Sequence, residues 1–127
     1  MTTKKISARI DNTLTEVIVK YDSKKLTMTF SEADNHKKIY QEKDIYACLA
    51  KIRSDFPHIT FLCKGAKINV MPSRMASQMS AGLVAYEMTL GKQASNEDIV
   101  HIFDYEESNL TNNPQDQIDF LSSGWHL

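Results

Sequence analysis

The sequence predicts a single α+β domain over residues 1–127: a mostly antiparallel sheet of about six strands, one main helix packed across it, a short central helix and C-terminal helical segments. Apolar and polar residues alternate through most of the first thirty residues and again after residue 58, which is the period of half-buried strands. Between these regions, apolar residues recur three and four apart, as in an amphipathic helix. A chain of 127 residues is long enough to bury a core without disulfide or metal staples.

The first thirty residues predict three antiparallel strands with one dry face. Residues 6–10 alternate, residues 13–21 are rich in β-branched side chains, and residues 25–30 alternate cleanly. The polar residues at 11–12 and 22–24 supply turn chemistry between these strands. The expected dry face consists of Ile6, Ala8, Ile10, Val17, Val19, Tyr21, Leu26, Met28 and Phe30.

The polar stretch 31–38 predicts a loop, and the main helix follows it. Basic residues Lys51 and Arg53 would lie in the last turns of this helix, where they suit the helix dipole, and Pro57 ends it. Because a sheet alone would leave its dry face open to water, we expect the helix to lie across the strands. Its expected apolar stripe consists of Ile45, Cys48, Leu49, Ile52 and Phe56.

Residues 59–91 predict two short strands, a short helix and a third strand. A tight reversal at Gly65 would pair the two short strands, since glycine adopts a positive φ readily. Ser73 is positioned to cap the short helix after Pro72, and Gly82 fits the residue just past the helix end. The expected buried face of the third strand consists of Val84, Tyr86, Met88 and Leu90.

The C-terminal part of the chain predicts helical segments. Residues 95–98 resemble a capping box ahead of an apolar run, 99–103, which fits either a short helix or a strand; we favour the helix. Pro114 would open the last helix and Gly124 would end it. The expected apolar face of this last helix consists of Ile118, Leu121 and Trp125.

Charge is strongly segregated along the chain. Residues 1–92 contain all fifteen Lys and Arg against nine Asp and Glu, a formal charge of +6, whereas residues 93–127 contain seven acidic residues and no Lys or Arg. An exposed acidic surface would steer a basic partner and select against acidic ones. The alternative is that these acidic side chains simply keep the protein soluble. The candidate partner-binding residues are Glu97, Asp98, Asp104, Tyr105, Glu106 and Glu107.

The sequence predicts a binding protein rather than an enzyme, with no metal and no cofactor. Cys48 and Cys63 lie in apolar stripes and are expected to be reduced core residues. The four histidines lack metal-ligand spacing, and neither a nucleophile elbow nor a phosphate-binding glycine loop occurs. The lysine pairs are not interleaved with aromatic residues, so nucleic acid is not an expected partner. Without an apolar run of signal-peptide or membrane-spanning length, we expect a cytoplasmic protein that does not bind membranes.

Three stretches resemble small bacterial immunity proteins encoded beside polymorphic toxin genes, including those of contact-dependent growth inhibition systems. They are FLCKGAKINVMPSRMASQM at residues 61–79, LVAYEMTLGK at 83–92 and EDIVHIFD at 97–104. The resemblance implies that the chain binds and neutralises a cognate toxin C-terminal domain. Many such toxins are nucleases, whose phosphate-binding sites are basic, so an acidic surface with Tyr105 as an anchor would suit them.

A second function stays open: a small regulatory or scaffold domain that binds another protein or a small ligand. It rests on a set of methionines that would form an adaptable pocket or surface, although we expect these side chains to fill the core under the central helix. The set consists of Met71, Met75, Met79 and Met88. The sequence predicts no oligomeric state.

Overall fold

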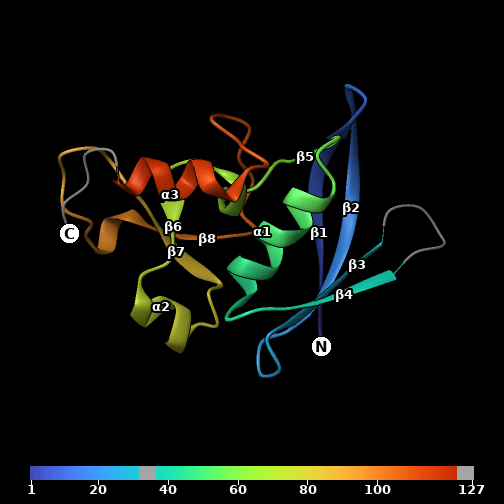
Figure 1. Ribbon diagram of the computed structural model, residues 1–127, viewed down its shortest axis with the longest axis horizontal. Coiled ribbons are helices and arrows are strands. Elements are labelled where there is room, and N and C mark those ends of the chain that lie inside the picture. Colours follow the sequence, from blue (N-terminus) through green and yellow to red (C-terminus); the bar gives the residue numbers. More distant parts are fainter. Residues whose placement is uncertain (32–36, 123–127) are drawn as a thin grey trace.

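The computed structural model describes residues 1–31 and 37–122 (Figure 1). These residues contain two antiparallel sheets and three α-helices. The first sheet has the strand order β4-β3-β2-β1-β5 and the second has the order β6-β7-β8. The predicted α+β class is therefore confirmed, but the strands are divided between two sheets.

The elements have the following bounds. The first sheet contains β1 (Thr2–Ile10), β2 (Thr13–Asp22), β3 (Thr27–Ser31), β4 (Lys37–Gln41) and β5 (Ile59–Phe61). The second contains β6 (Val70–Met71), β7 (Val84–Glu87) and β8 (Ile99–His101). The α-helices are α1 (Ile45–Asp55), α2 (Arg74–Met79) and α3 (Pro114–Ser122), and two 3-10 turns are η2 (Lys64–Ala66) and η3 (Asn96–Asp98).

The N-terminal meander is confirmed. β1 pairs with β2 along its whole length, from Thr2 opposite Tyr21 to Ile10 opposite Thr13, and β2 pairs with β3. The hairpin turn consists of two residues with positive φ, Asp11 and Asn12, which match the right-handed twist of the strands. Most of the predicted dry face is buried: Ile6, Ala8, Val17, Val19, Tyr21, Met28 and Phe30.

Strand β4 was missed by the sequence analysis. The predicted loop 31–38 includes the end of β3 and the start of β4, and its central residues, 32–36, lie outside the described residues. Strand β4 pairs with β3 at the edge of the sheet. Only Tyr40 of its five residues is buried, so the strand carries no clear alternation of apolar and polar residues.

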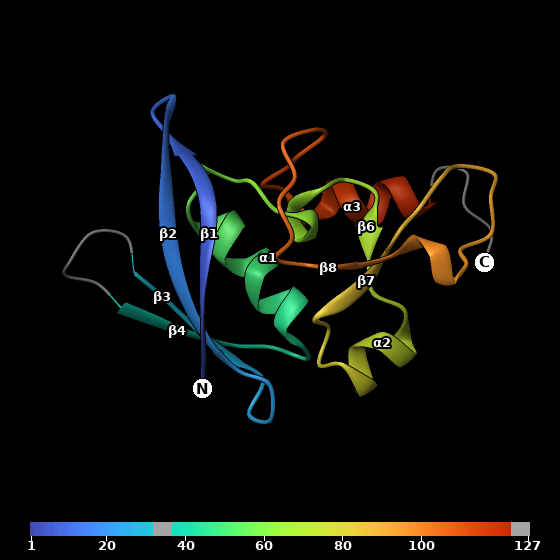
Figure 2. The ribbon, with the colours of Figure 1, turned by 180° about the vertical axis from the view of Figure 1, so that it is seen from behind.

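Helix α1 lies against the inner face of the first sheet (Figure 2). Ile45, Cys48, Leu49 and Ile52 are fully buried, as the stripe predicts. Arg53 lies in the last turn of the helix, as predicted, and its side chain is fully buried.

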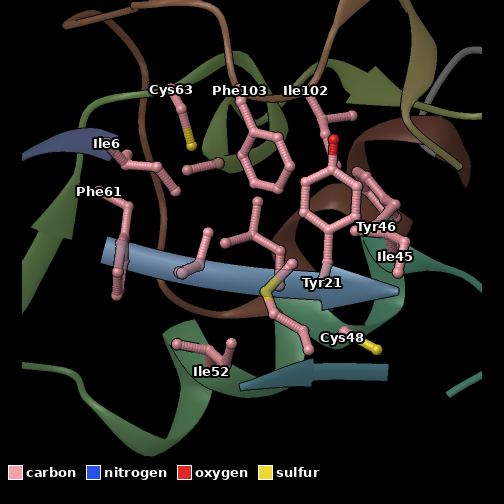
Figure 3. Close-up of a cluster of buried hydrophobic side chains, with 14 of the residues drawn as sticks. Ile6, Tyr21, Ile45, Tyr46, Cys48, Ile52, Phe61, Cys63, Ile102 and Phe103 are labelled. Atoms are coloured by element: carbon pink, nitrogen blue, oxygen red, sulfur yellow. The ribbon is translucent and has the colours of Figure 1, made fainter. Parts of the chain in front are cut away.

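One hydrophobic core joins the two sheets (Figure 3). The ring of Tyr21 from β2 stacks on the ring of Phe103, which follows β8, with centroids 5.5 Å apart. Ile102 and Phe61 belong to the same buried cluster. The second sheet is therefore part of the same packing unit as the first.

The predicted pairing of the two strands on either side of Gly65 is wrong. β5 pairs with β1 and β6 pairs with β7, so these strands belong to different sheets. Gly65 instead lies in the 3-10 turn η2, where an added Cβ would approach Leu49 Cδ2 to 2.7 Å. This position requires glycine because the turn packs directly on α1, rather than because of a reversal.

The short helix is confirmed, but its methionines are not in the core. Ser73 Oγ accepts a hydrogen bond from the backbone N–H of Ala76, as the capping pattern predicts. Helix α2 buries none of its residues, and the side chains of Met75 and Met79 are 68% and 82% exposed. In this set, Met88 is buried and Met71 is partly buried.

The prediction of which side chains of β7 face the core is also wrong. Ala85 is buried, Val84 and Tyr86 are only partly buried, and Leu90 is exposed. The regular strand ends at Glu87, so its two-residue period does not extend to residue 90.

The apolar run 99–103 does not form the helix that we favoured. Residues 95–98 form the predicted capping box, but it closes only the single turn η3. Strand β8 follows and pairs with β7, which suits the β-branched Ile99 and Val100.

Helix α3 begins at Pro114 as predicted, but its buried residue is Gln117. Ile118 is 48% exposed, and Trp125 and Gly124 lie outside the described residues. Leu121 of the predicted apolar face is partly buried, so the prediction is wrong at Ile118 but not at Leu121.

Gly82 provides a test of packing between α2 and α1. It has a φ of +75°, and an added Cβ would lie 2.7 Å from Asp44 Cγ; Gly91 has a φ of +76° with open space around it. We expect Gly82→Ala to lower the free energy of unfolding by about 2–4 kcal/mol and Gly91→Ala by about 1 kcal/mol, because only the first adds a steric clash to the backbone strain. Urea unfolding measures both, and equal losses would contradict the packing at Gly82.

Candidate functional site

The residues after β8 form a segment, 104–111, that makes two short antiparallel contacts: 104–106 with 62–64, and 109–111 with 66–68. Isolated β-bridges pair Cys63 with Tyr105 and Lys67 with Leu110. Backbone hydrogen bonds tie the two stretches along their length: Lys64 N–H to Asp104 O, Glu106 N–H to Leu62 O, Ile68 N–H to Asn109 O and Thr111 N–H to Ala66 O. The 104–111 segment is therefore positioned by backbone contacts that do not depend on its exposed side chains.

Four charged side chains form a closed cluster beside this segment. Lys64 Nζ contacts Glu87 Oε1 at 2.6 Å and Glu106 Oε1 at 3.0 Å, and Lys67 Nζ contacts Glu87 Oε2 at 2.9 Å and Glu106 Oε1 at 2.8 Å. The side chains are 12–29% exposed, so the cluster is partly shielded from solvent. We call these residues the four-charge cluster, and its formal charge is zero.

Both carboxylate oxygens of Glu106 already accept hydrogen bonds within the protein. Hydrogen bonds from Lys67 and Lys64, with further ones from the backbone N–H groups of Ser108 and Glu107, lower the pKa of Glu106 from 4.5 to about 2. Burial acts to raise the pKa of Glu87, but hydrogen bonds from both lysines outweigh it and keep that pKa below its usual value. The predicted partner-binding residue Glu106 is thus already paired within the protein.

Asp104, Tyr105 and Glu107 form an exposed surface on the 104–111 segment, which we call the Tyr105 surface. The Tyr105 side chain is 56% exposed, and its hydroxyl donates a hydrogen bond to Glu107 Oε2 at 2.9 Å. This hydrogen bond raises the pKa of Tyr105. The arrangement presents an exposed aromatic ring whose hydroxyl is held by one carboxylate, that of Glu107.

Glu97 and Asp98 lie apart from the Tyr105 surface. Both belong to the turn η3, before β8, whereas the Tyr105 surface follows β8. The Asp98 carboxylate accepts from the backbone N–H of Ser95 in the capping box and lies 3.7 Å from Lys92 Nζ. Of the six candidate residues, the structure therefore brings together three exposed ones, with Glu106 directed into the four-charge cluster.

A buried polar junction lies behind the 104–111 segment. The Arg53 guanidinium donates to the backbone carbonyl of Thr111 and, at 2.7 Å, to Gln117 Oε1. Gln117 Nε2 in turn donates to the carbonyls of Gly65 at 3.1 Å and Lys67 at 2.8 Å. Arg53 is 0% exposed and Gln117 is 3% exposed, so this junction joins α1, α3, η2 and the 104–111 segment inside the protein.

The two cysteines and His101 are withdrawn from solvent to different degrees. Cys48 and Cys63 are free and buried, and burial raises the pKa of each thiol to about 11. Burial lowers the pKa of His101, whose Nδ1 accepts a hydrogen bond from the Phe103 backbone N–H. Within residues 1–31 and 37–122, no group of three His, Cys, Asp or Glu side chains is placed to hold a metal ion. No helix in that part of the chain has the length and apolar character needed to cross a membrane.

No protein-family model matches this sequence, and no curated protein matches it. Any assignment of function therefore rests on the chemistry of its own surfaces.

The sequence analysis missed the four-charge cluster and the buried junction. Lys64 and Lys67 stand three apart, which gave a weak signal of a shared direction, but their partners are 20 to 42 residues away. Gln117 gave no signal, because a polar residue in an acidic helix is usually exposed.

The buried junction predicts a large loss of stability on truncation of Gln117. Gln117→Ala removes the acceptor of one buried Arg53 N–H and the side-chain donor to the Gly65 and Lys67 carbonyls, so we expect the free energy of unfolding to fall by about 2–4 kcal/mol. The matched control is Gln115→Ala on the exposed face of α3, which should change it by less than about 0.5 kcal/mol. Similar small losses in urea unfolding would show that the junction contributes little.

The four-charge cluster predicts a pH dependence. Because the pKa of Glu106 falls on folding from 4.5 to about 2, its contribution is fully present above about pH 4.5 and is lost as the pH falls towards 2. We expect Glu106→Gln to cost about 1–3 kcal/mol at neutral pH, with the difference from wild type shrinking towards zero at about pH 2. Glu16→Gln, on the outer face of β2, is the control. A difference that stays constant with pH would contradict the assignment.

Proposed function

We propose that this chain is an immunity protein that acts in the bacterial cytosol, where it binds and neutralises a cognate toxin domain through the Tyr105 surface. The observation that carries the proposal is the exposed ring of Tyr105, which is hydrogen-bonded to Glu107 and follows the exposed Asp104 on a backbone-paired segment. The resemblance of residues 61–79, 83–92 and 97–104 to immunity proteins supports it.

The geometry suits tight binding because the surface is preorganised. A partner that meets an already ordered segment does not have to supply the entropy cost of ordering it. Tyrosine is enriched among the residues that dominate binding energy, since a large ring loses few rotamers on burial. The segment 104–111 therefore has the properties expected of an interface centre.

The charge distribution favours a basic partner. The nearby Lys64 and Lys67 are neutralised by Glu87 and Glu106, so they do not offset the carboxylates of the Tyr105 surface. A nuclease toxin has a basic active site because it binds phosphates, and an acidic inhibitor would be steered to it. Arg9 interacts electrostatically with Tyr105 and marks the border of the acidic surface.

The alternative function is a small regulatory or scaffold domain that binds another protein or a small ligand. A groove of about 930 Å³ between α1, α2 and α3 favours it. The groove is distinct from the Tyr105 surface, because none of the residues of that surface lines it. Binding at the groove is compatible with toxin binding elsewhere.

Charge reversal tests the toxin-binding surface. The tagged chain is used to capture proteins from its native host at low and moderate salt, and capture should recover one stoichiometric basic toxin domain. We expect Asp104→Lys with Glu107→Lys to weaken binding of that toxin about 100-fold or more, and Tyr105→Ala about tenfold or more, because each change removes a contact at the interface centre. Isothermal titration calorimetry and survival of cells that express the toxin measure the effect.

The control is Glu16→Lys with Asp119→Lys, which changes the net charge equally at exposed positions of β2 and α3. Glu106 is left unchanged in both double variants, so that the four-charge cluster stays intact. Full protection by the Asp104 and Glu107 double variant would contradict the proposed surface. Capture of no specific partner from a host that expresses a toxin gene next to the gene for this chain would contradict the immunity function.

A further inference from the structure

A groove between α1, α2 and α3 is not used by the proposed function. It has a volume of about 930 Å³ and is open along one side. The three helices surround it, with α1 at the centre of Figure 1, α3 above and α2 below. A space of this size at the surface of a small domain is large enough for a ligand or for part of a partner protein.

The floor of the helix groove consists of small side chains. Ala47, Ala50 and Ser54 follow one another at helical spacing on the face of α1 that points away from the first sheet. Because they are short, another helix could approach the α1 backbone closely, at the lower end of the usual range of about 8–10 Å between axes. Pro114 and Ile118 of α3 add an apolar wall, and Ile118 is 48% exposed.

Three cations line the groove without a partner. Lys43, Lys51 and Arg74 form no ion pair with any other described residue. Asp44 also lines the groove, but its carboxylate accepts hydrogen bonds from the Ala47 backbone N–H and the Ser77 hydroxyl. These neutral donors leave the charge of Asp44 in place, so the lining has three exposed cations against the exposed Glu42 and the buried Asp44, a small surplus of positive charge. Charge complementarity points to an acidic occupant.

The spacing of the cations distinguishes a chain segment from a single small anion. Lys43 precedes Asp44, the N-cap of α1, whereas Lys51 lies six residues after the first residue of the helix, about 9 Å along its axis. They therefore do not converge on one point, and a ligand must carry negative charges at separated positions to meet both. Met71 of the edge strand β6 also lines the groove, but the backbone groups of Val70 in this two-residue strand are already bonded to Lys67 O and to the side chains of Tyr46 and Gln117, so an extended peptide has little strand edge to pair with.

We infer that the helix groove binds an acidic amphipathic helix of a partner protein. Small or medium apolar side chains of that helix contact Ala47, Ala50 and Ile118, and its carboxylates meet Lys43, Lys51 and Arg74. Nucleic acid is a poorer fit, because the groove-lining aromatic residue, Tyr46, is 8% exposed and donates its hydroxyl to Val70 O, so it offers no ring for base stacking. This inference does not depend on the toxin-binding surface.

The test uses the full chain and a phage-displayed library of random peptides of about 16 residues, enough for a helix longer than the groove. Selected peptides should be rich in Asp and Glu, with apolar residues three and four apart, and they should become helical on binding. In nuclear magnetic resonance spectra of the labelled protein, peptide addition should shift the backbone amides of Ala47, Ala50, Ser77 and Ile118. Selection of basic or proline-rich peptides, or of none, overturns the inference.

Two variants and a control locate the contact. Lys51→Glu with Arg74→Glu should weaken binding of the selected peptides about tenfold or more, because both residues are exposed and their loss removes the charge complementarity. Ala50→Trp should block the groove. The control, Lys5→Glu with Lys20→Glu on the outer face of the first sheet, should leave binding unchanged.

The remaining outcomes are also decisive. Equal weakening by the groove variant and the control shows non-specific charge attraction and overturns the inference. Amide shifts in the groove on addition of a single-stranded oligonucleotide, with no binding of acidic peptides, assign the groove to nucleic acid instead. Toxin capture by the Lys51 and Arg74 double variant should be unchanged, so a failure here is distinct from a failure of the proposed function.

Discussion

The buried hydrogen bond between Arg53 and Gln117 connects α1 with α3 in the interior of the protein. A guanidinium with no exposed surface is costly unless its donors are used, and here it donates to Gln117 and to the Thr111 carbonyl. Gln117 then donates to the carbonyls of Gly65 and Lys67. Helix α3 buries only this one residue, so its position depends on polar contacts more than on an apolar face.

Charge within the fold is divided between pairs that stabilise the protein and groups left free at its surface. Lys64 and Lys67 are neutralised by two glutamates brought from distant parts of the chain. What remains free is acidic at the Tyr105 surface and basic in the helix groove. The near-zero net charge therefore conceals two surfaces of opposite sign, each suited to a different partner.

Local patterns in the sequence were sufficient for the meander, the α1 stripe and the start of α3, because alternation and helical spacing reflect burial directly. These local patterns gave wrong predictions where contacts between distant parts of the chain determine the structure. Gly65 was expected in a reversal, but it is required by the approach of η2 to Leu49. Residues 99–101 form a strand because they pair with the edge of β7. At the candidate site, exposure of Tyr105 agrees with the expected surface, whereas the pairing of Glu106 depends on Lys64 and Lys67, which no local pattern connects to it.

The most direct test of this account is amide hydrogen exchange of the wild type and of Gln117→Ala. The account predicts that protection falls selectively at Gly65, Ile68 and Thr111, whose N–H groups bond across η2 and the segment that follows β8, while amides in β2 and β3 keep theirs. Such a result would show that the buried junction positions the segment that carries Tyr105. Unchanged protection at these three amides, or an equal loss throughout the protein, would contradict it.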